Sequence, residues 1–207
     1  MPASERRARR REQFLAAAVE TIGTEGYRSL RIRSLCTMAG LTDRYFYEEF
    51  GSLEDVLSVV YAQTMDRVFA ETLAQVEPPG TIAVEQQTFR LLDTFVRTVT
   101  ADRRRARIQL IEVVGVSPRI EAERRAVMRR FSSLLAEGIR ERDLADELNV
   151  DVDLTCVALV GAVDELLVAW INDEVGDDID AIVKAATALF VRAFLDEHVA
   201  LDQGAAW

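Results

Sequence analysis

The chain has very few of the residues that most often build metal sites, disulfides and catalytic centres. Its 207 residues include one histidine, His198, and two cysteines, Cys36 and Cys156, with no CxxC spacing. A single histidine excludes a multi-histidine metal site, and a Ser-His-Asp triad would have to use a residue near the C-terminus. Two distant cysteines indicate reduced intracellular thiols rather than a disulfide scaffold. We therefore expect no metal and no cofactor.

Long uncharged segments are also missing. The longest, Leu154 to Val163, falls short of the length that suggests a membrane span, which is roughly 18 residues. The apolar run Phe14 to Val19, behind the basic N-terminus, is too short for a signal peptide. Hydrophobic residues make up 49% of the chain, and this content excludes a disordered chain. The sequence predicts a soluble cytoplasmic protein without a membrane partner.

Positive charge is scarce overall but concentrated at one end. The net charge is −10, yet residues 1–50 hold nine arginines against seven acidic residues, while residues 51–207 hold 16 basic residues against 28 acidic ones. Five of the arginines lie together at the N-terminus: Arg6, Arg7, Arg9, Arg10 and Arg11. This asymmetry predicts a basic end that contacts a polyanion and an acidic body that does not.

Apolar residues recur with the period of an α-helix nearly throughout, and no alternating β-pattern of any length is present. Two stripes near the N-terminus predict a first and a shorter second helix: Leu15, Ala18, Val19 and Ile22, then Ile32, Leu35, Cys36 and Ala39. Thr42 is placed to cap a third helix that Gly51 ends. Further helices are expected over 53–77, 84–100, 102–115, from Ser117-Pro118 onward, over 151–173 and at the C-terminus. The fold class is thus all-α with about nine helices.

The segment LTDRYFYEEFGS, Leu41 to Ser52, combines four aromatic residues with charges. Phe46 and Phe50 are i, i+4 partners that should pack inward, on Ile22 and Leu35. The outer surface then carries Thr42, Asp43, Arg44, Tyr45 and Tyr47. Two short helices joined at Gly40 make a helix-turn-helix, whose second helix enters the major groove of DNA, where Arg44 can pair with guanine. A helical hairpin inside a bundle fits the spacing equally well.

The stretch GYRSLRIRSLCTMAGLTDRYFYEEFGSLEDVL, Gly26 to Leu57, resembles the N-terminal signature of TetR-type transcriptional regulators. The resemblance rests on shared positions across three helices: Gly26, Tyr27, Ala39, Gly40, Leu41, Thr42, Tyr47, Phe50, Ser52 and Glu54. It implies a DNA-binding domain over residues 1–52 and a helical ligand-binding and dimerisation domain over 53–207. It also implies a ligand-responsive regulator, a repressor, that binds a palindromic operator as a homodimer and is released by a small hydrophobic molecule.

The chain departs from this signature at several positions. Leu30 and Arg31 replace threonines, Arg44 replaces a small residue, and Glu49 and Leu53 replace a histidine and a lysine that usually touch phosphates. RYFYEEF resembles a variant of actinobacterial members. Arg31, Arg33 and the N-terminal arginines are expected to replace the missing contacts. The expected DNA-binding residues are Arg7, Arg31, Arg33, Thr42, Asp43, Arg44, Tyr45, Tyr47 and Ser52.

A ligand cavity is expected between the later helices, because a mostly apolar cavity with a few polar groups is typical of small-molecule sites. Its expected apolar lining is Met65, Phe69, Phe89, Leu92, Val96, Ile111, Phe131 and Trp170, and its expected polar groups are Tyr61, Gln109 and Glu165. For any single residue, packing in a core is the simpler explanation. Glu165 and the acidic body favour a neutral or cationic hydrophobic ligand.

The segment LTCVALVGAVDELLVAWI is apolar almost all the way round, so its helix must be covered on several sides. A symmetric pairing of this helix and the last one, from two copies of the chain, would cover it. The expected dimer-interface residues are Val157, Gly161, Val183, Phe190 and Phe194.

Two other classes of function remain open. An enzyme would have to use Asp164 and Glu165, since the sequence contains no nucleophile motif, metal cluster or phosphate loop; we expect none. The second is a helical small-molecule or lipid-binding protein with an inactive DNA-binding part, which Glu49 and Leu53 favour. Binding to the protein's own upstream DNA separates this class from a regulator.

Overall fold

The computed structural model describes residues 2–142 and 151–195, and these form helices joined by loops, with no strand among them. The α-helices are α1 (Ala3–Glu25), α2 (Ile32–Ala39), α3 (Asp43–Glu49), α4 (Leu53–Leu73), α5 (Val84–Thr100), α6 (Arg103–Arg107), α7 (Pro118–Arg140), α8 (Val152–Ile171) and α9 (Ile179–Leu195). A 3₁₀ turn, η1 (Tyr27–Ser29), and a π-helical turn, η2 (Ile108–Glu112), complete them. The prediction of an all-α fold of about nine helices is confirmed.

The chain divides into two compact units, and each unit is made of two separate stretches of the sequence. The first contains Met1–Val68 and Thr98–Arg125, and the second contains Phe69–Arg97 and Ala126–Trp207. The predicted DNA-binding domain, 1–52, lies wholly inside the first unit, but α4, α6 and η2 contribute to that unit as well. The boundary at residue 52 therefore stays a prediction.

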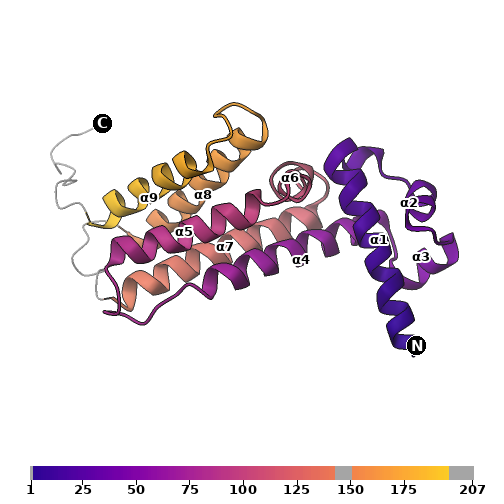
Figure 1. The fold of residues 1–207 in the computed structure, drawn as a ribbon, viewed down its shortest axis with the longest axis horizontal. Coiled ribbons are helices and arrows are strands. Elements are labelled where there is room, and N and C mark those ends of the chain that lie inside the picture. The colour runs from indigo at the N-terminus through magenta and orange to yellow at the C-terminus, as the bar shows by residue number, and fades with distance from the viewer. Residues whose placement is uncertain (1, 143–150, 196–207) are drawn as a thin grey trace. The chain divides into compact units, whose positions relative to one another are not determined.

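The helix-turn-helix of the first unit consists of α2 and α3, which lie beside the long α1 (Figure 1). Phe14 and Ile22 of α1, Leu35 of α2 and Phe46 of α3 are completely buried. Gly40 ends α2 in the left-handed region, at φ 66° and ψ 31°. Glycine adopts this conformation without strain. The inward packing predicted for Phe46 and Phe50 agrees with their burial.

The helix predicted over 102–115 is interrupted. Its α-helical part, α6, ends at Arg107, and the next turn widens into the π-helical η2. Asp102 caps α6 by accepting a hydrogen bond from the Arg104 backbone N–H at 3.0 Å. Apolar periodicity does not distinguish this arrangement from one continuous helix. A single π-turn changes the angular positions of the residues that follow it on the helix, but the sequence stays equally apolar on both sides of the turn.

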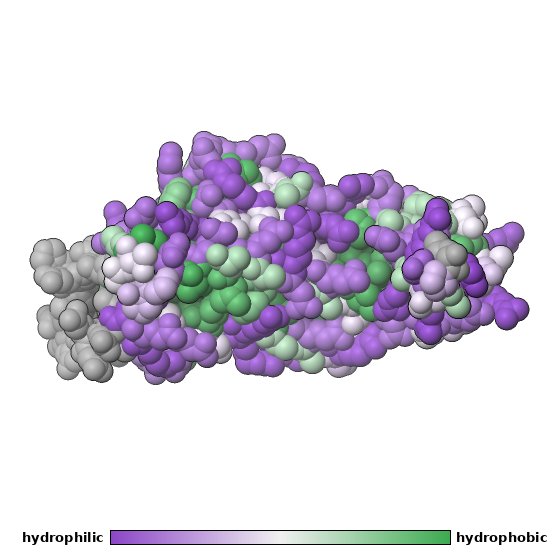
Figure 2. All heavy atoms as spheres, turned by 60° about the horizontal axis from the view of Figure 1, so that its bottom comes forward, coloured by the Kyte–Doolittle hydropathy of each residue, from purple (hydrophilic) through white to green (hydrophobic). Residues whose placement is uncertain are grey.

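The second unit is built from α5, α7, α8 and α9, which run along one another (Figure 1), and side chains from all four line one cavity. Helix α8 is long and apolar enough to cross a membrane by length and composition alone, a test that core helices also pass. Its longest uncharged run ends at Val163, because Asp164 and Glu165 follow without making the helix polar. Figure 2 shows one face of the molecule, where hydrophobic side chains gather in separate patches on a mostly hydrophilic surface.

Candidate nucleic-acid interface and ligand cavity

Helix α3 separates its aromatic residues into an inner and an outer set. The ring of Phe14 meets the rings of Phe46 and Phe50 edge to face, at centroid distances of 5.8 and 6.1 Å. On the outer side, Arg44 and Tyr47 are exposed, with 85% of the Arg44 side chain accessible to solvent. The buried rings thus fix a helix too short to be stable alone, and its outer side offers one guanidinium and one phenol to a partner.

The N-terminal arginines do not form a separate arm, because residues from Ala3 onward belong to α1. Arg7, Arg10 and Arg11 lie at positions i, i+3 and i+4 on one face of α1, which continues to Phe14, so all three lie close to α3. We call this face the basic face of α1. The guanidinium of Arg10 lies 4.4 Å from the ring centre of Tyr45, and that of Arg11 lies 4.7 Å from the ring centre of Phe50. Tyr45 is accordingly half-buried rather than fully exposed.

Glu49 joins α3 to this basic face. Its carboxylate accepts a hydrogen bond from Arg7 Nε at 2.9 Å and lies 3.9 Å from an Arg11 nitrogen, and only 2% of its side chain is exposed. Arg7 and Arg11 also donate to the last backbone carbonyls of α3, those of Glu48 and Glu49. Glu49, at the position where the sequence departs from a histidine of the TetR-type signature, is therefore a buried partner of two arginines.

Of the other residues predicted to contact DNA, Arg31, Arg33 and Thr42 are exposed, and Ser52 is half-buried. One Arg31 nitrogen donates to the backbone carbonyls of Arg28 and Leu30 at 2.7 Å. Thr42 occupies the cap position of α3, but its side chain makes no capping bond among the described residues. Ser52 Oγ accepts a hydrogen bond from the Asp55 N–H at the start of α4. Their roles in DNA binding stay predictions.

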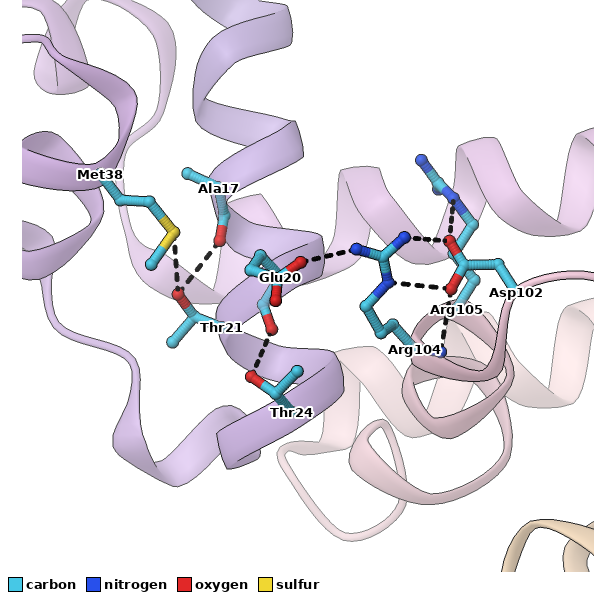
Figure 3. A network of polar contacts seen from close by, with 8 residues as sticks. All are labelled: Ala17, Glu20, Thr21, Thr24, Met38, Asp102, Arg104 and Arg105. Carbon is cyan, nitrogen blue, oxygen red and sulfur yellow. Dashed lines mark hydrogen bonds and ion pairs between the residues drawn. The ribbon is translucent and has the colours of Figure 1, made fainter.

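The end of α1 is packed very closely on α6. A Cβ added at Gly23 would lie 2.3 Å from the Cβ of Arg104, so only glycine fits there. Figure 3 shows Arg104 between Glu20 and Asp102, bonded to their carboxylates at 2.6 and 3.0 Å. These contacts anchor α1, against which α2 and α3 pack, to α6 within the first unit.

A second contact links η2 to the residues that follow α1. The carboxylate of Glu112 accepts hydrogen bonds from the Tyr27 backbone N–H at 2.8 Å and from Arg107 Nε at 2.9 Å. Gly26, at φ 87°, lets the chain pass this carboxylate, which is 3.2 Å from where a Cβ would be. Glu112 thus takes the place of a backbone acceptor at the turn between α1 and η1.

The second unit contains a cavity of about 350 Å³, near the lower end of the range usual for small-molecule sites. Its apolar lining includes Leu73, Val76, Val84, Leu91, Leu92, Phe95, Phe131, Leu134, Leu135, Ile139, Val160, Val163 and Phe190. Its charged lining residues are Glu137, Glu141 and Arg142. Such a lining suits an apolar chain that carries a polar group at one end.

A buried glutamine shapes one end of this cavity. Gln87 accepts a hydrogen bond from the Glu77 backbone N–H and donates one to the Gln75 backbone carbonyl, both at 2.9 Å. Arg142 donates to the carbonyl of Glu77 at 3.2 Å. The segment between α4 and α5 is therefore held to α5 and to the turn that follows α7.

The structure brings part of the predicted ligand set to the cavity. Leu92 and Phe131 line it. Other members lie in the second unit without lining it: Phe69, which contacts the Phe131 ring at 5.3 Å, Val96 and Trp170. Four belong to the first unit: Tyr61, Met65, Gln109 and Ile111. Gln109 is buried, and neither of its amide atoms has a hydrogen-bond partner among the described residues.

Phe89 and Glu165, also expected in the lining, are exposed and do not line this cavity. The helical period fixes which residues share a face but not which face turns inward. Phe95, which lines the cavity and meets the Phe131 ring at 5.2 Å, was missed. Its i, i+3 spacing from Leu92 was the signal that could have identified it.

The outer face of α8 is apolar and uncovered within the described chain. Leu154 is 71% and Val157 57% exposed, and Ala158 and Gly161 continue the same face. In contrast, Val183, Phe190 and Phe194 are buried within the chain itself, and Phe190 lines the cavity. These three predicted interface residues are therefore core residues, whereas Val157 and Gly161 lie on the accessible surface.

Groups suited to catalysis or metal binding are scarce in the part of the chain that the structure describes. No group of three histidine, cysteine or acidic side chains that could hold a metal ion is found among the described residues, and His198 lies outside them. Burial raises the pKa of the Cys36 and Cys156 thiols to about 11, so both are protonated and unreactive at neutral pH. The alternative of an enzyme, which was weighed from the sequence, gains no support from these groups.

Comparison with known proteins gives distant but extensive likenesses, although no family model matches the sequence. The fatty acid metabolism regulator protein of Bacillus subtilis (strain 168) is 21% identical over 183 residues, which cover 86% of this chain and 92% of that protein. The fatty acid degradation regulator FadR from Bacillus halodurans has a TM-score of 0.72 at 21% identity, covering 88% of this chain and 94% of that one.

Two further solved structures extend the likeness. The transcriptional regulator FadR from Bacillus subtilis, in complex with stearoyl-CoA, has a TM-score of 0.70 at 19% identity, covering 88% of this chain and 98% of that one. A TetR-like transcriptional regulator from Rhodococcus sp. RHA1 has a TM-score of 0.71 at 18% identity, covering 88% and 94%. The chain therefore has the fold of TetR-type regulators over most of its length, and the resemblance read from Gly26–Leu57 is confirmed.

Proposed function

We propose that this protein is a ligand-responsive transcriptional repressor of the TetR type, which acts in the cytoplasm. It binds a palindromic operator as a homodimer and leaves the DNA when an apolar ligand occupies the cavity. The observation that carries the proposal is the exposure of Arg44 and Tyr47 on a helix that buried Phe46 holds in place. A side chain in that position reaches base edges when α3 enters the major groove.

The proposed ligand carries a long fatty acyl chain. The cavity lining is mostly aliphatic and aromatic, and a solved structure with this fold holds stearoyl-CoA. The expectation of a neutral or cationic ligand depended on Glu165 and on the acidic body, and Glu165 is exposed and does not line the cavity. Arg142, which lines the cavity together with Glu137 and Glu141, is the cationic group that would bind an anionic end of the acyl ligand.

The proposed dimer pairs α8 and α9 of two copies. Leu154, Val157, Ala158 and Gly161 form an apolar face along α8, and a second copy can cover it symmetrically. Small residues at its centre allow two helices to approach closely. This arrangement gives two copies of α3, as a palindromic operator requires.

Release requires that the acyl ligand bind the DNA-free conformation more tightly than the DNA-bound one. Helix α4 contributes Leu53–Val68 to the first unit and Phe69–Leu73 to the second, and Thr72 and Leu73 line the cavity. We propose that this helix transmits the effect of ligand binding, changing the separation of the two DNA-binding units.

The test is a gel shift with the DNA upstream of the protein's own gene, without ligand and with stearoyl-CoA, stearate or coenzyme A. We expect a specific complex that stearoyl-CoA dissociates and coenzyme A does not. Release by stearate as well would place recognition in the acyl chain alone. Acyl-chain binding without any DNA complex would instead support the alternative, a lipid-binding protein with an inactive DNA-binding part.

A further inference from the structure

We propose that Glu49 is a positioning residue for DNA binding, which holds Arg7 and Arg11 where their guanidinium groups contact the phosphate backbone. The inference rests on the proposed function. It assigns a role to an acidic residue that stands where the resembling family usually has a phosphate-contacting histidine. On charge alone, an acid at a DNA interface should weaken binding.

The geometry around Glu49 opposes that simple expectation. Its side chain is 2% exposed, and the Arg7 and Arg11 guanidinium groups lie over its carboxylate at 2.9 and 3.9 Å. Its negative charge is therefore covered by two positive charges, and a phosphate outside meets the arginines first. The three charged groups together keep a net positive charge.

The same contacts leave both arginines accessible. The side chains of Arg7 and Arg11 are 63% and 36% exposed. Each therefore keeps N–H donors that Glu49 does not use. Arg7 Nε and one terminal nitrogen are directed to Glu49 and to the Glu48 carbonyl. A flexible arginine that is already held in place loses less side-chain entropy on binding a phosphate.

A neighbouring interaction reinforces this placement. Arg10, which lies between Arg7 and Arg11 in the sequence, rests against the Tyr45 ring at 4.4 Å. The basic face of α1 is thus fixed to α3 by Glu49 and Tyr45 together. Because α3 is the helix proposed to read bases, these contacts fix the positions of the three arginines relative to α3.

The test compares Glu49→Gln with the matched control Glu48→Gln. Both changes remove one negative charge from neighbouring positions, but Glu48 pairs with Arg44 on the exposed side, at 3.0 Å, rather than with the basic face of α1. Binding to fluorescein-labelled duplex from the upstream region is measured between about 50 and 200 mM salt, where phosphate contacts dominate the dependence.

We expect Glu49→Gln to weaken binding about three- to tenfold and to reduce the slope of log affinity against log salt by about 1 to 2, the loss of one or two phosphate contacts. Glu48→Gln should bind at least as tightly as wild type. A Glu49→Gln protein that binds as tightly as wild type, or more tightly, would overturn the inference, because removal of the negative charge would then be the whole effect.

Two further measurements keep the inference testable if Glu49→Gln weakens the fold. In a double-mutant cycle, Arg7→Gln should weaken binding in the wild-type background and have little further effect beside Glu49→Gln. Tryptic cleavage near Arg6 to Arg9 should become faster in Glu49→Gln and stay unchanged in Glu48→Gln, even without DNA. If the wild-type protein binds no duplex, both the proposed function and the contacts of Arg7 and Arg11 with phosphates are refuted. If tryptic cleavage of Glu49→Gln is the same as that of wild type, the positioning role of Glu49 is refuted, whatever the DNA binding.

Discussion

At the scale of single residues, Arg44 is the side chain best placed to recognise a base. Its ion pair with Glu48 is exposed, and pairs of this kind contribute about 0–1 kcal/mol. Exchanging this partner for a guanine edge therefore costs little. The neighbouring Tyr47 is also exposed, whereas Phe46 between them is buried and cannot reach DNA.

Arg44→Ala should weaken operator binding by about 1–3 kcal/mol and relax the preference at one base position of each half-site. The measurement is affinity for the operator and for variants substituted at each position. Arg33→Ala, which removes an exposed arginine from α2, serves as the control and should weaken binding to all sequences alike. An unchanged base preference in Arg44→Ala would show that α3 does not read bases through this residue.

A second prediction at this scale concerns pH. The hydrogen bond from Arg104 holds the pKa of Asp102 below its ordinary value, and that from Arg119 does the same for Asp55. A carboxylate with a lowered pKa stabilises the fold above its unfolded pKa, about 3.9, and loses this contribution as pH falls through its folded value. Asp102→Asn should therefore lower the free energy of unfolding at pH 7, and its difference from wild type should shrink below about pH 4. Urea titrations at several pH values test this; a constant difference would contradict it.

At the scale of the elements, α8 has two different faces. Cys156, Leu159, Val163 and Leu167 are buried in the second unit, whereas Leu154, Val157 and Gly161 are accessible. Gly161 is the most informative of these, because a Cβ there meets no described atom within 4 Å. A side chain at this position is harmless to one copy of the chain and harmful only where a second copy packs against it.

Gly161→Arg should convert the dimer into a monomer and abolish operator binding at ordinary concentrations, without reducing helix content. The control is Ala126→Arg, which places the same side chain on an exposed position of α7 and should leave the dimer intact. Sedimentation velocity measures the mass, and circular dichroism measures the fold. A Gly161→Arg protein that remains dimeric would place the interface elsewhere.

At the scale of the whole molecule, the chain separates its two proposed tasks into two compact units. Arg44, Tyr47 and the basic face of α1 belong to the first unit, and the cavity belongs entirely to the second. Under the proposed function, ligand and DNA therefore do not compete for one surface. Any effect of the ligand on DNA binding must be a coupling between two conformational states.

Val160→Trp should fill part of the cavity and weaken stearoyl-CoA binding strongly while leaving operator affinity unchanged, so that the variant stays on DNA in the presence of ligand. Phe89→Ala is the matched control, because Phe89 is exposed and does not line the cavity. Calorimetry measures ligand binding, and the gel shift measures release. Normal release of Val160→Trp would show that the ligand acts from another site.

The sequence predicted the helices and the inner face of the helix-turn-helix well, because both depend on local spacing. Phe46 and Phe50 follow the i, i+4 rule, and burial agrees with it. It missed contacts between segments that are distant in the chain. Phe14 completes the aromatic cluster, and Glu49 binds Arg7 across 42 positions, which no short-range pattern records.

The cavity was the least predictable feature for a related reason. Periodicity gives the angular position of a residue on its helix, but the lining depends on which helices lie opposite. Leu92 and Phe131 were identified because they are strongly apolar positions on amphipathic helices. Phe190 was assigned to a dimer interface, since a buried residue and an interface residue have the same composition in a sequence.

The close contact of Gly23 with Arg104 also bears on how the protein folds during synthesis. The first unit contains residues 1–68 and 98–125, so the end of α1 finds its partner only after α6 has been made. When only the helix-turn-helix has left the ribosome, the surface of α6 that α1 packs against has not yet been made. Forming the contact between α1 and α6, which are far apart in sequence, delays folding. A DNA-binding fragment that ends at residue 52 or 68 would lack that partner. The shortest N-terminal fragment with a complete first unit extends to Arg125.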